Sequence, residues 1–184
     1  MTYSSSNGLV VAVSSDNKHR FSKQPVRSIE ILAGFGVRGD AHGGDTVRHR
    51  SRVEQDPTQP NLRQVHLIHA ELLEELDRKG FEVNPGDLGE NITTRGVDLL
   101  LLGRDTLLRI GSDAVLSVTG LRNPCAQVDE FAPGLLAELV EKTGDQIVRK
   151  AGIMCVALRG GIVQPGDGIH VERPEGPHIP LDRV

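Results

Sequence analysis

The sequence predicts a mostly β protein with some α-helix, folded as a closed or nearly closed β-barrel with about two flanking helices. Glycine is abundant at 21 residues and proline reaches 10, which is typical of many turns between short strands. The chain has four Phe, one Tyr and no Trp, so its core must consist of Leu, Val, Ile and Ala. The absence of βαβ alternation and of glycine-rich phosphate-binding fingerprints disfavours Rossmann and P-loop folds.

Short aliphatic and β-branched runs, each followed by a turn signal, predict the strands. In chain order these runs are 9–13, 28–32, 91–94, 106–110, 114–119, 153–158 and 169–172. A three-residue loop that begins with Gly111 predicts a hairpin between two of them. The strands therefore outnumber the helices, as a barrel requires.

Two apolar stripes at helical spacing predict helices over 65–79 and 134–143. Gly80 is well placed to end the first helix. Residues 33–60 are poor in apolar side chains, which indicates either a mobile linker or a functional loop. We expect residues 1–172 to form one domain and the proline-containing residues 173–184 to form a C-terminal tail.

The charge pattern argues against nucleic-acid and membrane partners. The net charge is −4, with no overall basic excess, so no nucleic acid polymer is expected. The longest apolar run, 99–102, is far too short to span a bilayer, and the N-terminus lacks a signal-peptide pattern. A basic run at 48–52, with Arg38 and Arg63 on either side, fits a small anionic ligand, although a solvated charge run is equally compatible.

The two cysteines have different surroundings. Cys125 follows a predicted strand and a Pro-containing turn, with Arg122 near enough to favour its thiolate. A thiolate binds a soft metal or accepts sulfur, whereas the alternative is an inert buried cysteine. Cys155 lies in an apolar run and is expected in the core. Two cysteines make no disulfide framework, so a reducing cytoplasm is expected.

Two polar segments are candidate ligand-binding elements. One contains Arg38, Gly39, Asp40 and His42, where glycine allows close backbone approach and the cationic side chains can donate to an anion. The other, 85–94, supplies neutral hydrogen-bonding groups that suit the edge of a pterin ring. The alternative for both segments is ordinary turn chemistry.

His66 and His69 are spaced so that they could share one helix face as a metal pair. No third ligand has matching spacing, so we prefer a structural role for both. The sequence contains no cysteine and histidine cluster with zinc-finger spacing.

Taken together, four segments resemble the MOSC domain, named for the C-terminal domain of molybdenum-cofactor sulfurase, and most closely its stand-alone bacterial members. The matching segments, in the expected order, are Gly39-Asp40-Ala41-His42, Pro85 to Ile92, Arg122-Asn123-Pro124-Cys125, and Ala151 to Asp167. The resemblance covers nearly the whole chain, and the order of the segments makes it specific.

The resemblance implies a barrel with a cysteine in its cleft, a role in binding molybdenum cofactor (molybdopterin) or in carrying sulfur, and in some members reduction of N-hydroxylated compounds such as hydroxylamino purines. By this resemblance Cys125 is the catalytic residue and molybdenum ligand. The residues implied in cofactor binding are Arg38, Gly39, Asp40, His42, Asn91, Thr93, Thr94, Arg122 and Asn123. A purified sample can lack the cofactor.

Three hypotheses follow. The first is a molybdenum-cofactor protein that reduces N-hydroxylated substrates. Because the chain has no ferredoxin or flavin domain, an external electron donor is expected. The second is a sulfur carrier that holds a Cys125 persulfide received from a cysteine desulfurase. The third is a non-catalytic barrel with a degenerate site. No pyridoxal-phosphate domain precedes the barrel, so a complete sulfurase is not expected.

Overall fold

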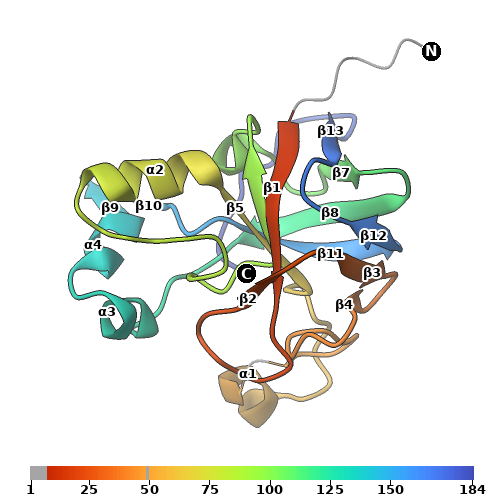
Figure 1. Cartoon of the computed structure of the whole chain (residues 1–184), viewed down its shortest axis with the longest axis horizontal. Coiled ribbons are helices and arrows are strands. Elements are labelled where there is room, and N and C mark those ends of the chain that lie inside the picture. Colours follow the sequence, from red (N-terminus) through yellow and green to blue (C-terminus); the bar gives the residue numbers. More distant parts are fainter. Residues whose placement is uncertain (1–7, 49) are drawn as a thin grey trace.

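The computed structural model describes residues 8–48 and 50–184 and shows a closed barrel with smaller elements packed around it (Figure 1). The barrel strands are β1 (Gly8–Ser15), β5 (Val65–His69), β6 (Ile92–Arg95), β7 (Leu107–Ile110), β8 (Ala114–Leu121), β11 (Ile153–Arg159) and β13 (Gly168–Glu172). They pair in the order β13-β7-β8-β11-β5-β6-β1, and β1 returns to β13. The predicted fold class is confirmed.

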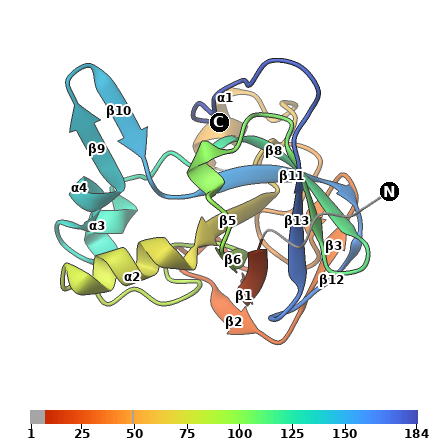
Figure 2. The same ribbon diagram turned by 90° about the horizontal axis from the view of Figure 1, so that it is seen from above.

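Shorter strands surround the barrel. β2 (Gln24–Val26) extends β1, while β3 (Ile29–Leu32), β4 (Gly36–Val37) and β12 (Gly161–Val163) form a separate sheet. A hairpin of β9 (Val140–Thr143) and β10 (Gln146–Arg149) projects from the side of the barrel that carries helix α2 (Ala70–Arg78) (Figure 2). Most of these short strands were not predicted, because two to four residues carry too little pattern to identify.

The helices are all short. They are α1 (Arg50–Gln55), α2 (Ala70–Arg78), α3 (Gln127–Phe131), α4 (Leu135–Leu139) and the 3₁₀-helix η1 (Leu99–Leu101). The part of the chain described here thus has four α-helices, where two were predicted. None of them is long and apolar enough to cross a membrane.

Two apolar clusters hold these layers together. The barrel interior contains side chains such as Leu67, Ile92 and Leu116, all fully buried. The second cluster lies between the barrel and helices α2, α3 and α4, and includes Ile68 and Leu72. Because side chains alternate along a strand, Leu67 points into the barrel and its neighbour Ile68 points under the helices. Strand β5 is therefore buried on both faces.

Two predicted helices are only partly correct. Residues 65–79 divide into strand β5 and helix α2, and residues 134–143 divide into helix α4 and strand β9. In the first case the apolar residues of β5 continue the helical spacing of α2, so periodicity alone cannot separate the buried strand from the helix that follows it. The predicted strands at 9–13, 28–32, 91–94, 106–110, 114–119, 153–158 and 169–172 are confirmed to within two residues at each end.

The polar loop 33–60 and the C-terminal segment 173–184 both contain ordered structure. Within 33–60 the chain forms β4 and α1, and Thr46 pairs with Pro60. His49, which belongs to the basic run, lies outside the described residues. The C-terminal segment, expected as a tail, forms bridges between Gly103 and Pro180 and between Leu121 and Arg183. Its division from the rest of the domain at residue 172 stays a prediction.

Candidate functional site

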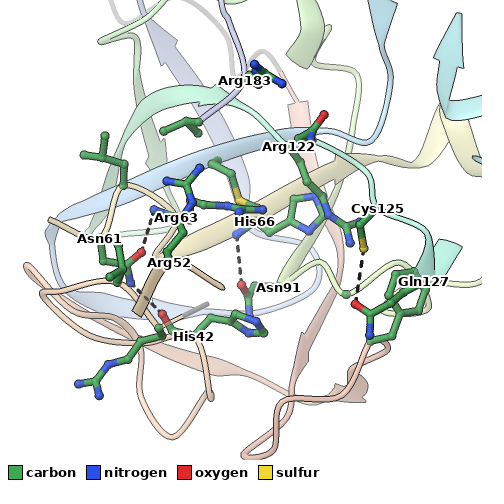
Figure 3. Close-up of a pocket in the computed structure, with 18 of the residues that line it drawn as sticks. His42, Arg52, Asn61, Arg63, His66, Asn91, Arg122, Cys125, Gln127 and Arg183 are labelled. Atoms are coloured by element: carbon green, nitrogen blue, oxygen red, sulfur yellow. Dashed lines mark hydrogen bonds between the residues drawn. The ribbon is translucent and has the colours of Figure 1, made fainter. Parts of the chain in front are cut away.

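A cavity of about 720 Å³ opens where loops from one end of the barrel meet the C-terminal segment (Figure 3). Its wall is made by residues from seven regions: the loop after β1, the loop 42–63 with α1, strand β5, the loop before β6, the loop after β8 with the start of α3, strand β11, and the chain end. These include Lys23, His42, Arg52, Arg63, His66, Asn91, Arg122, Asn123, Cys125, Gln127 and Arg183. The site therefore assembles from residues far apart in the sequence.

Cys125 lies in the loop that joins β8 to α3, and its side chain is exposed to the cavity. Its carbonyl accepts the backbone N–H of Val128 at 3.0 Å, which ties the loop to the start of α3. Its sulfur lies 3.5 Å from Oε1 of Gln127. A thiol in this position is accessible to a ligand, whereas the fully buried Cys155 is not.

Arg122 is buried beside Cys125. Its Nη1 donates to the carbonyl of Leu88 at 2.6 Å, and its guanidinium lies 5.6 Å from the centre of the Phe21 ring. Burial lowers the pKa of Arg122, and the nearby charges of Cys125 and Glu90 act in the opposite direction. Their spacing in the sequence predicted that Arg122 lies near Cys125, and in the structure the two groups are close enough to interact.

Arg63 forms a second cation next to the same cysteine. Burial, followed by the charges of Arg52 and Arg122, lowers the pKa of Arg63 to about 10, while Cys125 acts to raise it. The guanidinium groups of Arg52 and Arg122 therefore both repel that of Arg63, and Arg63 and Arg122 both interact with the charge of Cys125. Such an arrangement costs free energy unless an anion binds among them.

Cationic side chains outnumber anionic ones on the rest of the wall. Six arginines and Lys23 line the cavity, and no Asp or Glu from the described part of the chain lines it. Arg20 pairs with Asp16 at 3.4 Å, and Lys23 pairs with Asp40 at 2.7 Å. The other five arginines have no ion-pair partner among residues 8–48 and 50–184. They are Arg48, Arg52, Arg63, Arg122 and Arg183. On a protein of net charge −4, this is a local cationic cavity.

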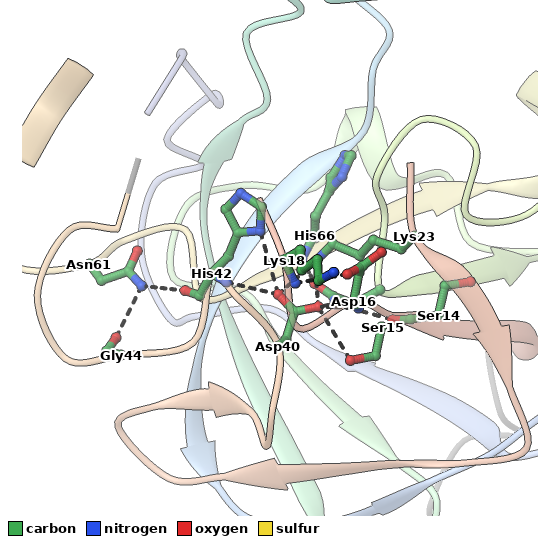
Figure 4. A network of polar contacts seen from close by, with 11 residues as sticks. Ser14, Ser15, Asp16, Lys18, Lys23, Asp40, His42, Gly44, Asn61 and His66 are labelled. Carbon is green, nitrogen blue, oxygen red and sulfur yellow. Dashed lines mark hydrogen bonds and ion pairs between the residues drawn. The ribbon is translucent and has the colours of Figure 1, made fainter. Parts of the chain in front are cut away.

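A buried ion pair supports the floor of the cavity (Figure 4). Lys23 Nζ lies 2.8 and 2.7 Å from the two carboxylate oxygens of Asp40, and their side chains are 3% and 0% exposed. Asp40 also accepts the backbone N–H groups of Asp16 and His42 and the side-chain amide of Asn91. Burial opposes ionisation of Asp40, but His42 and Lys23 outweigh it and hold the pKa of this carboxyl well below its usual range.

His66 lies on strand β5 at the base of the cavity. Its Nε2 lies 2.7 Å from the carbonyl of Ala151, and burial, followed by the charge of Arg122, holds the pKa of His66 well below its usual value. The imidazole is therefore neutral, with Nε2–H as the donor. Within the described ranges no three His, Cys, Asp or Glu side chains form a group that could hold a metal ion.

The predicted site residues fall into two groups. Cys125, Arg122, Asn123, His42 and Asn91 all line the cavity. The amide of Asn91 is largely engaged, because its Nδ2 donates to Ser14 and Asp40 and its Oδ1 accepts from the backbone N–H of His66. The Oδ1 of Asn123 accepts a hydrogen bond from Nε of Arg149, so the NH₂ group of Asn123 can donate to a ligand.

The remaining predicted residues lie outside the cavity wall. Arg38 is exposed and pairs with Glu30 at 2.6 Å, and Gly39 occupies a turn with φ of 76°. Asp40 lies beneath the floor. Thr93 donates to buried Glu90 at 3.1 Å, and Thr94 is buried next to it. Cofactor contacts by these five residues stay predictions.

Several wall residues were not predicted. Arg20, Lys23, Gln127 and Met154 stand in segments without a recognisable motif, and Arg183 lies in the segment expected as a tail. Arg48, Arg52 and Arg63 belong to the basic run or flank it, and that run was the available signal for them.

Comparison with known proteins agrees with this geometry. Residues 38–170 match the MOSC domain. The YuaD protein from Bacillus subtilis has a similar fold, with a TM-score of 0.71, 24% identity, and coverage of 92% of this chain and 96% of that one.

YiiM from Escherichia coli is also similar, with a TM-score of 0.61, 16% identity, and coverage of 93% and 73%. YiiM from Geobacillus stearothermophilus gives a TM-score of 0.58, 17% identity, and coverage of 95% and 77%. No curated protein sequence matches the chain. At these identities the solved structures show a shared fold and nothing more. The family match covers most of the sequence, and the chain therefore belongs to the MOSC domain family.

Proposed function

We propose that the cavity binds molybdenum cofactor and that the protein reduces N-hydroxylated substrates, such as hydroxylamino purines, with electrons from an external donor. The observation that supports this most directly is the position of Arg63 and Arg122 next to Cys125, with Arg52 next to Arg63, on a described wall that has no Asp or Glu. These groups combine an anion site with a soft sulfur ligand. Membership of the MOSC family is consistent with such a cofactor.

The residues present fit the chemistry of this cofactor. Its phosphate is an anion, for which guanidinium groups are the preferred partners. Its molybdenum can take a thiolate ligand, and the exposed thiol of Cys125 is the one on this wall. Its pterin edge needs neutral donors and acceptors, and Asn123 and Gln127 stand on the wall next to Cys125. We therefore assign Arg63 and Arg122 to the phosphate, Cys125 to the metal, and these amides to the pterin.

The proposed reaction is R–NHOH + 2e⁻ + 2H⁺ → R–NH₂ + H₂O, in which the N–O bond breaks and the oxygen leaves as water. The bound cofactor supplies the two-electron couple. The chain supplies position and protons. His42 is the candidate proton donor on the wall, and its Nδ1 lies 3.5 Å from Oδ1 of Asp40.

The first test is metal and pterin content of protein made in a cofactor-producing host. We expect near-stoichiometric molybdenum and pterin in the wild type, loss of molybdenum in Cys125→Ser, and loss of both in Arg63→Gln. Arg173→Gln, an exposed arginine outside the cavity, is the matched control and should retain both. Wild-type protein without molybdenum would contradict the proposal.

The exposure of Cys125 also favours a second candidate, the sulfur carrier. Here the thiolate attacks a persulfide donor, and Cys125 holds the transferred sulfur until a partner accepts it. After incubation with a cysteine desulfurase and cysteine, mass spectrometry should show an adduct of about 32 Da, one sulfur atom, that Cys125→Ser abolishes. A degenerate, non-catalytic barrel would give neither cofactor nor adduct. Both active candidates place the protein in a reducing cytoplasm.

A further inference from the structure

The C-terminal segment forms part of the cavity wall. The backbone N–H of Leu121 donates to the carbonyl of Asp182 at 2.8 Å, and Val184 donates back to Leu121 at 3.2 Å. Leu181 packs against the barrel core, and Arg183 and Val184 face the cavity. The segment is thus held along the end of β8 from both sides of Arg183.

Two glycines provide the space for this segment. A Cβ on Gly120 would lie 2.5 Å from the carbonyl oxygen of Asp182 and 2.9 Å from Cβ of Val184. A Cβ on Gly103 would lie 2.9 Å from Nδ1 of His178. These approaches are closer than a real Cβ allows, so the segment can dock only where the barrel lacks side chains. The position of Arg183 is therefore built into the fold.

Arg183 is electrostatically separate from the arginines around Cys125. The pKa of Arg63 is lowered by burial, Arg52 and Arg122, and Arg183 is not among the groups that shift it. Figure 3 likewise draws Arg183 at the upper edge of the cavity, apart from Arg52 and Arg63. The described residues give Arg183 no carboxylate partner. The cavity accordingly has two cationic positions.

A single phosphate cannot satisfy both positions. A phosphate carries a charge of about −1.5 to −2 at neutral pH. The positive charge of Arg52, Arg63 and Arg122 together is already larger than this, so one phosphate bound there leaves no negative charge for Arg183. We propose that Arg183 binds a second phosphate, carried by the substrate, so that the substrate is an N-hydroxylated purine nucleotide and not the free base. This inference rests on the proposed function. Arg183 is a substrate-binding residue that takes no part in breaking the N–O bond.

A binding experiment on the full, cofactor-free chain tests the second position. The probes are adenosine 5′-monophosphate and adenosine 3′,5′-bisphosphate, measured by calorimetry at low salt. We expect the wild type to bind the bisphosphate about ten-fold more tightly, since a hydrogen-bonded charge pair contributes that much. Arg183→Gln should remove this preference, Arg183→Lys should restore part of it, and Arg173→Gln should leave it unchanged.

A second variant moves Arg183 without changing any charge. Gly120→Ala places a methyl group against the carbonyl of Asp182, so the segment must shift and the bisphosphate preference should fall as in Arg183→Gln. Equal affinity of the wild type for both probes, or an unchanged preference in Arg183→Gln, overturns the inference. Arg63→Gln reports separately on the proposed function, because it should weaken binding of both probes. If it does not, the arginine cluster is not the anion site.

The cofactor-loaded protein then identifies which molecule carries the second phosphate. We expect Arg183→Gln to lower kcat/KM about ten-fold for the N-hydroxylated adenine nucleotide and to leave the value for N-hydroxyadenine unchanged. An equal loss for both substrates would assign the second phosphate to a nucleotide-extended cofactor and would contradict the substrate assignment. In both outcomes the binding data still decide whether Arg183 is an anion-binding residue.

Discussion

Beneath the cavity, the side chain of Asp40 connects the loop after β1, its own loop and the start of β6 by hydrogen bonds. Its two oxygens accept from Lys23, Ser15, Asn91 and two backbone N–H groups, and its side chain is inaccessible to solvent. The sequence identified Asp40 as part of a polar turn next to glycine. It could not show that the partner is Lys23, 17 residues away, or that the pair is buried. Burial is decided by the barrel and not by the local sequence.

Replacing Asp40 with Asn should strongly destabilise the protein. The variant leaves the buried ammonium of Lys23 without a counter-charge, and breaking a buried pair in this way costs about 3–5 kcal/mol. The matched control is Glu30→Gln, which removes the exposed partner of Arg38 and should cost less than about 1 kcal/mol. Urea unfolding of both variants measures the difference. Equal losses would show that the Lys23–Asp40 pair contributes no more than a surface pair.

Secondary structure was predicted best where a recognisable turn separates two elements, and worst where a strand and a helix follow each other directly. β7 and its hairpin partner β8 were identified by apolar runs and a glycine-containing loop. β5 was assigned to a helix, because α2 follows it without a break and the apolar residues of the two elements together fall at helical spacing. Helix α4 was extended into β9, since Leu135 to Val140 continues the apolar stripe while hairpin pairing with β10 is a tertiary effect.

The start of β11 offers a test of how closely the elements pack. Gly152 has φ of 84°, and a Cβ there would clash with the carbonyl oxygen of Leu67 on β5. Gly144, in the β9–β10 turn, has φ of 62° with nothing near its Cβ position. Alanine at Gly144 should cost about 1–2 kcal/mol, the cost of the left-handed backbone alone.

Alanine at Gly152 should cost at least about 3 kcal/mol, because the clash with Leu67 adds to the same backbone cost. It should also displace Arg122, whose backbone N–H donates to the carbonyl of Gly152 at 3.0 Å. Chemical denaturation gives both costs. A similar loss for the two alanine variants would mean that β5 and β11 can separate without penalty.

Over the whole molecule, the site depends on closure of the barrel. Cys125, Arg122, Asn123, His42 and Asn91 could be predicted because each lies in a segment with a local motif. All five line the cavity. Lys23 and Arg183 lie in segments that carry none. They reach the cavity only after the loop behind β1 folds over Asp40 and the C-terminal segment docks on β8. Such residues can be found from the structure but not from spacing.

Closure also makes the stability of the whole protein depend on pH. His66, on β5, is covered by the residues before β11, where its ring contacts the carbonyl of Ala151. Burial and the charge of Arg122 hold the pKa of His66 well below 6.5. In the unfolded chain the same imidazole takes up a proton near pH 6.5. Below that pH the unfolded state therefore binds more protons, and stability falls with pH until the folded-state pKa is reached. His69, whose pKa burial also lowers, acts in the same direction.

We expect the free energy of unfolding to drop between pH 7.5 and pH 5.5, with His66 contributing about 1.4 kcal/mol of the loss. His66→Gln keeps a donor for the carbonyl of Ala151 but cannot titrate, so its loss should be smaller by that amount. Urea unfolding of the two proteins at both pH values measures this, since every other titrating group is common to both. Asp40 should add nothing in this range, because its lowered pKa makes its stabilisation complete above about pH 4. Parallel losses in the two proteins would mean that the folded protein accommodates a protonated His66, and that the base of the cavity is open to water.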